Sequence, residues 1–383
     1  MNGFEFATAQ KIVFGRGKLA DLAVHACGLG ERALLVTGSR PERAERARDL
    51  LEGAKVTVFT LSVPKEPTTE LARQGVELSR QSGVDFVVGI GGGSALDLAK
   101  AIAALVANGG DPLDYLEVVG RGRALSKPSL PCILVPTTAG TGSEVTRNAV
   151  LQAEAERVKV SLRSPHMLPV LALVDPELTL TVPPEVTAAT GLDALTQVME
   201  PYVSNARGAL TDALSVEGMR RAARSLVRAY EHGDDLDARE DLSVTSLFGG
   251  LALANSKLGA VHGLAGPLGG SFEAPHGALC ARLLPHVMRA NLNASRQRGL
   301  HEIVERYGTI ASLLLGRAAE ADEGIAWVEE LVERVRIPRL AEHGVTGAHF
   351  EGIVAKGRAA SSMKGNPVEL SPEELTRVLE RAL

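Results

Sequence analysis

The sequence FVVGIGGGS occupies residues 86–94 and joins an apolar run to three consecutive glycines. The run Phe86 to Ile90 is short and contains β-branched residues, which favours a buried strand. The glycines and Ser94 lead directly into Ala95 to Val106, whose composition is that of a helix. A strand that enters a helix through glycines is typical of an α/β domain with a parallel sheet.

Further runs of strand length lie on both sides of this one. Each is apolar, is bounded by glycine or proline, and is separated from the next by a segment long enough for a helix. They are Lys11–Gly15 (an edge strand or hairpin arm), Ala33–Thr37, Lys55–Phe59, Pro131–Val135 and Leu171–Val174. This pattern predicts a mostly parallel sheet with crossover helices in the first half of the chain.

The second half has a different pattern, because helix formers dominate from about Pro183 onward. Amphipathic periodicity covers 211–230, 242–258, 301–315 and 324–336. At 383 residues the chain exceeds what one hydrophobic core usually supports. We therefore expect an α/β domain at 1–182, an all-helical domain at 183–383, and an active site in the cleft between them.

The composition is that of an ordinary soluble globular protein, with 45% hydrophobic and 23% charged residues. A formal net charge of -5 gives no electrostatic reason to expect nucleic acid or an anionic membrane as a partner. No apolar run approaches the length of a membrane span, and residues 1–30 lack the pattern of a signal peptide. Cys27, Cys132 and Cys280 cannot all pair, so we expect a reducing, cytoplasmic location.

The glycine cluster is a candidate phosphate site. Glycines let the backbone approach a pyrophosphate, and the N-terminus of the following helix attracts an anion. The residues concerned are Gly91, Gly92, Gly93 and Ser94. The sequence is neither GxGxxG nor a Walker loop, and a tight strand-to-helix turn is the alternative interpretation. The preceding strand and following helix favour phosphate binding.

A second loop with small residues and hydroxyl groups follows the run that ends at Val135. Its sequence is PTTAGTGSEVT, from Pro136 to Thr146. Taken alone it could equally be a capped helix start, because Thr and Ser favour N-caps. Together with the glycine cluster it is interpreted as nucleotide lining.

A third group of residues has the composition of a metal site. Asp193 and Gln197 are four residues apart in a helical segment, so both lie on one face. His262 and His276 bracket a glycine- and proline-rich segment, which we expect to form a turn that brings the two imidazoles together. Each residue could instead satisfy a buried backbone group. Two imidazoles and a carboxylate favour a catalytic divalent ion.

At these residues the chain resembles the iron-containing alcohol dehydrogenases, also called group III alcohol dehydrogenases. The resemblance covers nearly the whole chain. It rests on IVFG at 12–15, GGGS at 91–94 with Asp97 and Lys100, the 136–146 run, GLDALT at 191–196, VHG at 261–263, PHG at 275–277 and LLPH at 283–286.

The resemblance implies reversible hydride transfer between a nicotinamide cofactor and a small alcohol, aldehyde or ketone. It also implies a dinucleotide-binding N-terminal domain, a helical C-terminal domain and association as a homodimer or larger homo-oligomer. The resemblance assigns pyrophosphate contacts to Gly92, Gly93 and Ser94, and nucleotide contacts to Thr137, Thr138, Thr141 and Thr146. It assigns nicotinamide-ribose contacts to Asp97 and Lys159. It assigns the catalytic metal contacts to Asp193, Gln197, His262 and His276.

Two positions depart from the family pattern. Gln197 stands where a third histidine ligand is usual, and Gly266 stands where a histidine near the nicotinamide is frequent. The related glycerol dehydrogenases manage with one aspartate and two histidines, and the related maleylacetate reductases are thought to need no metal. We expect Fe²⁺ or Zn²⁺ to be bound, with a metal-independent ketone reductase as the alternative.

The residues after the first core strand bear on the choice between NAD and NADP. NAD-preferring relatives often carry an acidic residue there, which repels a 2′-phosphate. This chain has Gly38, Ser39 and Arg40, so nothing repels the phosphate and two side chains could bind it. The sequence therefore predicts NADP in preference to NAD.

Two other functions share this fold. A lyase resembling dehydroquinate synthase would need a pocket rich in Lys and Arg, but residues 262–276 contain no cationic side chain besides the histidines. A chain that only binds nucleotide, without catalysis, would also account for the two absent histidines.

Overall fold

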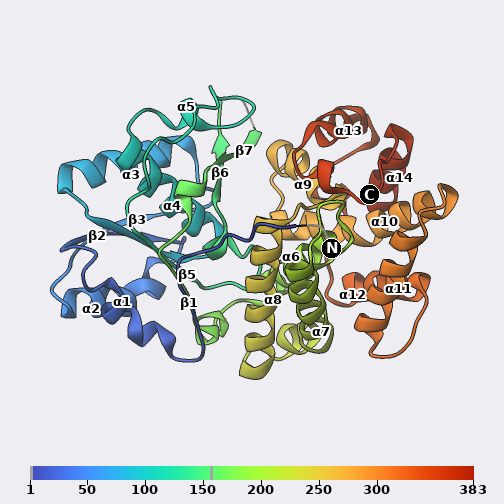
Figure 1. Cartoon of the computed structure of the whole chain (residues 1–383), viewed down its shortest axis with the longest axis horizontal. Helices are drawn as coiled ribbons and strands as arrows, with labels where there is room; N and C mark the ends of the chain where they lie inside the picture. The colour runs from blue at the N-terminus through green and yellow to red at the C-terminus, as the bar shows by residue number, and fades with distance from the viewer. Residues whose placement is uncertain (1–2, 156–157) are drawn as a thin grey trace. The chain divides into compact units, whose positions relative to one another are not determined.

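The computed structural model describes residues 3–155 and 158–383, and contacts divide the chain into two compact units (Figure 1). The α/β unit consists of Ala7–Thr138 and Gly142–Thr179. The helical unit consists of Leu180–Leu383 together with Ala139–Thr141 and an N-terminal segment that ends at Phe6.

The α/β unit is built on a six-stranded sheet in the order β1-β8-β5-β4-β2-β3, in which every pair of neighbours is parallel. The strands are β1 Ile12–Phe14, β2 Arg32–Thr37, β3 Thr57–Ser62, β4 Phe86–Gly91, β5 Cys132–Pro136 and β8 Leu171–Val174. The predicted fold class, a mostly parallel sheet followed by a helical half, is confirmed. The N-terminal run is an edge strand rather than a hairpin arm, because β1 pairs in parallel with β8.

One strand begins later than the sequence pattern suggests. The run predicted from Lys55 becomes β3 only at Thr57. Lys55 has a positive φ of 66°, and the N–H of Val56 donates to the carbonyl of Leu51. These two residues therefore complete the turn after α2 (Glu45–Gly53) before the strand starts.

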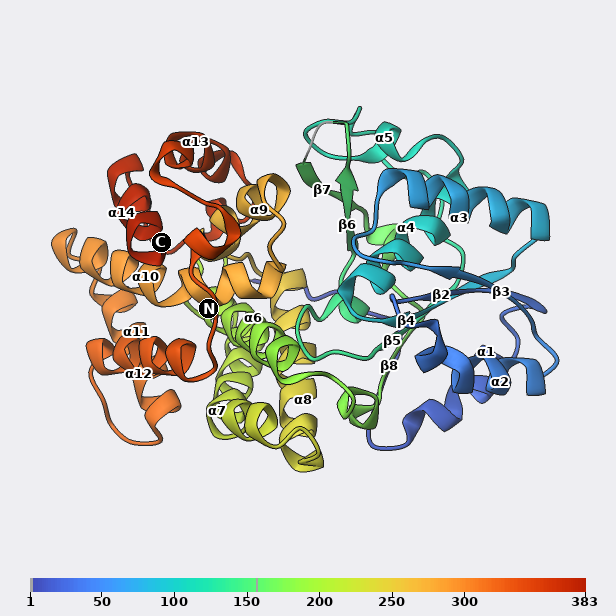
Figure 2. The ribbon, with the colours of Figure 1, turned by 180° about the vertical axis from the view of Figure 1, so that it is seen from behind.

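Helices cover both faces of the sheet, with α1 (Leu22–Ala26) and α2 on one face and α3 (Thr69–Ser82) and α4 (Gly93–Asn108) on the other (Figure 2). Alternation along β2 matches this layering. Leu34 and Val36 lie in the core beneath α3 and α4, whereas Ala33 and Leu35 lie in the core beneath α1 and α2. Strands that are buried on both faces explain the continuous apolar runs in the sequence.

The sheet has a topological switch point between β2 and β4. The chain continues from β2 to its outer neighbour β3, and from β4 to β5 on the other side. Ligands in open α/β sheets bind outside the carboxyl ends of the strands at such a point. Here those ends are Gly38 and Gly91, which pack directly together: a Cβ on Gly91 would lie 2.7 Å from the Ala95 Cβ and 3.2 Å from the Gly38 amide nitrogen.

A two-stranded antiparallel hairpin, β6 (Asn148–Ala153) and β7 (Val158–Arg163), lies outside the main sheet. The sequence analysis did not predict it. Most of its residues alternate between buried and partly buried, so neither strand has the continuous apolar run by which the central strands were predicted.

Nine α-helices make up the helical unit, counted over residues 180–383. They are α6 Pro184–Val203, α7 Ala209–Glu231, α8 Leu236–Asn255, α9 Ala260–Ser271, α10 His276–Gln297, α11 His301–Leu315, α12 Ala321–Arg334, α13 Phe350–Ala359 and α14 Pro372–Ala382. Helix α6 is buried along nearly its whole length and packs against α7, α8 and α10. Across the described residues, no helix combines the length and apolar character that crossing a membrane requires.

The segment between the two predicted histidine ligands is a helix, and the expectation of a turn was wrong. Helix α9 runs through Gly263, Gly266 and Pro267, and only residues 272–275 connect it to α10. Glycine and proline are usually unfavourable inside a helix, but burial and packing can override that local preference. The glycines are needed for close packing: a Cβ on Gly263 would lie 2.8 Å from the Met363 Cε, and one on Gly357 of α13 would lie 3.2 Å from the Gly263 carbonyl.

Glu144 generates a prediction about the pH dependence of stability. Its side chain is 1% exposed, and its Oε2 has no hydrogen-bond partner among the described residues. Burial raises the pKa of Glu144 to about 7, against a smaller lowering by a backbone hydrogen bond and the charge of Lys100. A carboxyl group whose pKa rises on folding stabilises the fold below its unfolded pKa, and that stability is lost as the pH rises through the folded pKa.

We therefore expect Glu144→Gln to match the wild type in thermal stability at pH 4.5 and to exceed it by about 3 kcal/mol at pH 8. Melting curves of both proteins at a series of pH values provide the measurement. A stability difference that does not change with pH would show that Glu144 is already ionised in the fold.

Candidate active site

Helices α6, α9 and α10 place one carboxylate and two imidazoles together in the helical unit. Asp193 lies on buried α6, His262 in the first turn of α9, and His276 is the first residue of α10. The His262 Nε2 lies 3.4 Å from the Asp193 Oδ1, and the two imidazole centroids are 5.6 Å apart. The predicted triad Asp193, His262 and His276 thus forms one cluster.

A glycine makes this approach of α10 to α6 possible. A Cβ on Gly277 would lie 2.5 Å from the Ala189 carbonyl oxygen and 3.4 Å from the Asp193 Cβ. The first turn of α10 therefore packs directly on the backbone of α6. That contact brings His276, the residue before Gly277, beside Asp193.

The structure adds Cys280 to this cluster, and the sequence analysis missed it. The potential ligand atoms of Asp193, His262, His276 and Cys280 all lie within 4.8 Å of one another. Cys280 follows His276 by four residues on α10, so the two share a helix face. That spacing was visible in the sequence, but it carries a signal only once residues 276–280 are known to be helical.

The residues fit a divalent cation. Asp193 is 2% exposed, and its Oδ1 has no hydrogen-bond partner among the described residues. Burial opposes ionisation, but the adjacent His262 ring, 3.4 Å away, and the charge of His276 lower the pKa of Asp193. Burial likewise opposes protonation of His262, yet Cys280 and Asp193 raise its pKa well above the usual value. The cluster therefore attracts positive charge, which a metal ion or protons can supply.

Gln197 lies one turn after Asp193 on α6 and is also buried. Its Nε2 donates to the carbonyl of Gly140 at 3.0 Å. That bond fixes the amide and leaves its Oε1 buried without a hydrogen-bond partner among the described residues. The oxygen is the only atom of this amide that can ligate a cation.

Glu200, which the sequence analysis also missed, orients His262. The His262 Nδ1 and the Glu200 Oε2 are 2.6 Å apart, and the Val261 N–H donates to the Glu200 Oε1 at 2.7 Å. A carboxylate that accepts from Nδ1 leaves the Nε2 lone pair free for a metal ion. Glu200 follows Asp193 by seven residues on α6, so both lie on one face of the helix.

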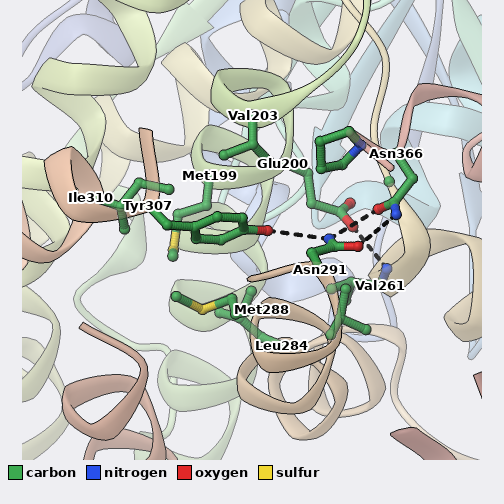
Figure 3. Close-up of a pocket in the computed structure, with 13 residues that line it drawn as sticks. Met199, Glu200, Val203, Val261, Leu284, Met288, Asn291, Tyr307, Ile310 and Asn366 are labelled. Carbon is green, nitrogen blue, oxygen red and sulfur yellow. Dashed lines mark hydrogen bonds between the residues drawn. The ribbon is translucent and has the colours of Figure 1, made fainter. Parts of the chain in front are cut away.

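A buried polar network lies beside Glu200 in a small pocket (Figure 3). The Asn291 Nδ2 donates to the Tyr307 hydroxyl at 3.1 Å, and the Asn366 Nδ2 donates to the Asn291 Oδ1 at 2.7 Å. The Asn366 Oδ1 accepts from the Ala260 N–H at 3.0 Å. Together with Glu200, these side chains accept hydrogen bonds from N–H groups in the first turn of α9. They therefore fix the start of α9 and, with it, the position of His262.

In the α/β unit, the glycine cluster forms the junction between β4 and α4. Gly92 is the N-cap of the 16-residue helix α4, and no side chain caps it. The Thr137 N–H donates to the Gly91 carbonyl at 2.8 Å, and a Cβ on Gly92 would lie 3.4 Å from the Thr138 Oγ1. The two predicted nucleotide loops therefore meet at the N-terminus of a long helix, where a phosphate is favoured.

Several predicted cofactor residues have internal partners here. Asp97 accepts hydrogen bonds from the Ser143 hydroxyl and the Val150 N–H, and the Thr146 hydroxyl accepts from the buried ammonium of Lys100 at 2.8 Å. These contacts tie the β6 hairpin and its preceding loop to α4. The Lys159 ammonium pairs with Glu66 at 2.9 Å. Their roles in cofactor binding stay predictions.

The remaining predicted residues fall at three places. Gly38 packs against Gly91 at the switch point, and Ser39 is exposed beside it. Gly93 and Ser94 form the first turn of α4 and are partly buried. Thr141 belongs to the short segment that is grouped with the helical unit.

Comparison with known proteins gives matches over almost the whole chain. The family model described as iron-containing alcohol dehydrogenase matches residues 9–176, and the model described as Fe-containing alcohol dehydrogenase family, C-terminal, matches residues 187–383. Alcohol dehydrogenase 4 of Schizosaccharomyces pombe is 36% identical over 377 residues, which cover 97% of this chain and 87% of that protein.

Two further relatives extend the comparison. The NAD-dependent methanol dehydrogenase of Bacillus methanolicus is 33% identical over 380 residues, which cover 97% of each chain. The solved structure of a 1,3-propanediol oxidoreductase has a TM-score of 0.92, 32% sequence identity and complete coverage of both chains.

The contact between Glu200 and His262 generates a prediction about metal affinity. Glu200→Gln removes the negative charge and places an amide NH₂ against one of two N–H donors. We expect the affinity for Zn²⁺ to fall by about 10–100-fold, the usual effect of losing a partner that orients a histidine ligand. Competition with a chromophoric chelator measures it. Glu305→Gln, at an exposed position of α11, is the matched control, and wild-type affinity in Glu200→Gln would contradict this orienting role.

Proposed function

Because this chain belongs to the iron-containing alcohol dehydrogenase family, we propose that it uses a divalent ion held by Asp193, His262 and His276. Family membership makes the chain an alcohol dehydrogenase, an oxidoreductase that acts with a nicotinamide cofactor on a small alcohol or carbonyl compound. One observation carries the residue assignment: Asp193 has a buried carboxylate oxygen with no hydrogen-bond partner among the described residues, and its ligand atom lies within 4.8 Å of those of His262 and His276.

When bound, the nicotinamide accepts or supplies the hydride, and the divalent cation acts as a Lewis acid toward the alcohol or carbonyl oxygen. Asp193 contributes a negative charge at that point, and burial makes the charge effective. Glu200 accepts from the His262 Nδ1 and so directs the basic Nε2 toward the site. Gly266 stands where a histidine is frequent in the family, and we assign the proton relay to no side chain.

The carboxyl ends of β2, β4 and β5 support the proposed dinucleotide site. The pyrophosphate would lie at Gly92, Gly93 and Ser94, where N–H groups of the first turn of α4 and the helix dipole favour an anion. Thr137 and Thr138 follow β5 beside this turn, and their hydroxyl groups are suited to the nucleotide.

The cellular location and the oligomeric state of the protein are also part of the proposal. The three cysteines are free thiols, which is compatible with a reducing cytoplasm. Association as a homodimer or larger homo-oligomer is proposed from the family resemblance.

Metal removal tests the proposed function. Protein treated with a strong chelator should lose alcohol oxidation with NAD⁺ or NADP⁺, and Fe²⁺ or Zn²⁺ should restore it. Asp193→Asn should not be restored, because it loses the charge that holds the ion. Full activity after complete metal removal, verified by elemental analysis, would favour a metal-independent reductase instead.

The residues after β2 generate a prediction about the cofactor. Ser39 and Arg40 are exposed, and residues 38–41 contain no carboxylate. We propose that these side chains accept a 2′-phosphate, so kcat/KM is higher with NADP⁺ than with NAD⁺. Ser39→Asp should reverse this order by repelling the phosphate. Steady-state kinetics with both cofactors measure it, and equal efficiencies or an NAD⁺ preference in the wild type would contradict the proposal.

Gly266 generates a prediction about substrate size. It follows His262 by four residues on α9, and a Cβ built there meets no atom within 4 Å. We propose that this space accepts bulkier or branched carbonyl compounds. Gly266→Leu should lower kcat/KM for a branched alcohol by about tenfold relative to ethanol. Gly352→Leu, at an equally open exposed position of α13, is the control; an unchanged substrate profile in Gly266→Leu would refute the assignment.

A further inference from the structure

Cys280 has the surroundings of a metal ligand rather than of an ordinary core cysteine. It is 0% exposed, and its Sγ lies 3.5 Å from the His276 Nε2. Bond lengths of 2.0–2.3 Å around a tetrahedral ion place neighbouring ligand atoms roughly 3.3–3.7 Å apart. The separations between His276 and Cys280, and between His262 and Asp193 at 3.4 Å, both fall in that range.

Independent observations point to a ligand at this place. The Oδ1 of Asp193 and the Oε1 of Gln197 are buried acceptors without hydrogen-bond partners among the described residues. Both side chains are only 2% exposed, so water does not compensate them from the surface. The two acceptors lie on adjacent turns of α6, and the Asp193 ligand atom lies within 4.8 Å of imidazole nitrogens and a thiol, as is expected where a cation binds.

Gln197 is the weaker candidate for the fourth position. Its amide is neutral, and its Nε2 is already held by the carbonyl of Gly140. A thiolate carries a full negative charge and is a strong, soft ligand for Zn²⁺ and Co²⁺. Asp193 and an ionised Cys280 would together balance the charge of a divalent ion.

We propose that the Cys280 thiolate is the fourth protein ligand of the divalent ion, in place of the histidine that is usual at position 197. The inference rests on the ion of the proposed function. Binding releases the thiol proton to solvent, and sulfur and metal form the new bond without a change of oxidation state. Zinc can expand from four to five ligands, so four protein ligands do not exclude a reactant. The sulfur donor makes the site selective for Zn²⁺ or Co²⁺ over harder cations such as Mg²⁺.

Cobalt spectroscopy tests the proposal on the full chain. Chelator-treated protein is titrated with Co²⁺ in the absence of oxygen, and the near-ultraviolet band of thiolate-to-cobalt charge transfer is recorded. The double variant Cys27→Ser/Cys132→Ala keeps Cys280 as its only thiol, and neither substituted residue belongs to the metal cluster. It should show the band at one equivalent of Co²⁺, with the same intensity as the wild type.

The ligand variants give the complementary result. Cys280→Ser and Cys280→Ala should lose the band and bind Co²⁺ at least about tenfold more weakly, whereas Gln197→Ala should keep the band. The double variant alone decides the question if the Cys280 variants fail to fold.

The outcomes separate this inference from the proposed function. Stoichiometric Co²⁺ binding without a sulfur band would overturn the thiolate ligand while leaving the metal site intact, and a loss of affinity in Gln197→Ala alone would identify the amide as the fourth ligand. No Co²⁺ binding in any form of the protein would overturn the metal-dependent function and this inference together.

Discussion

The buried carboxylate of Asp193, which lies beside two imidazoles, is the group on which the proposed metal site of the helical unit depends. It lies on α6, the most enclosed helix, and three other structural features are arranged around it. Because Gly277 has no side chain, α10 packs on the backbone of α6, and His276 reaches Asp193. Glu200 and Asn366 bind the first N–H groups of α9, so that His262 reaches the same point. Buried polar groups of this kind are costly unless a ligand satisfies them, which ties the architecture to a cation.

In the α/β unit, backbone groups rather than side chains form the proposed binding site. Gly91 and Gly38 pack together at the switch point of the sheet, where no Cβ would fit on Gly91. The first turn of α4 begins there without a side-chain cap, and its N–H groups remain available to an anion. Lys100 and Asp97 then fasten the β6 hairpin and its loop to α4. The two proposed sites thus differ in their binding chemistry, with an anion site in the first unit and a cation site in the second.

Much of the fold could be predicted from the sequence, because buried parallel strands and amphipathic helices leave strong periodic patterns. The limits appear where packing overrides local preference. The glycines and proline between His262 and His276 predict a turn, but most of that segment is helix α9, whose small residues allow close contact with Met363 and α13. The triad Asp193, His262 and His276 could be named from residue type and family resemblance. Cys280 and Glu200 could not, because their relevance depends on helix faces that only the tertiary structure brings together.

The central claim is that Asp193, His262 and His276 hold one divalent ion. Anomalous diffraction at the zinc absorption edge, from crystals of the full chain grown with Zn²⁺, tests it most directly. The account predicts a single strong peak within bonding distance of all three side chains, about 2.0–2.2 Å from each ligand atom. Side chains that point apart around an ordered solvent molecule, with no anomalous peak among them, would contradict it and leave only the nucleotide site.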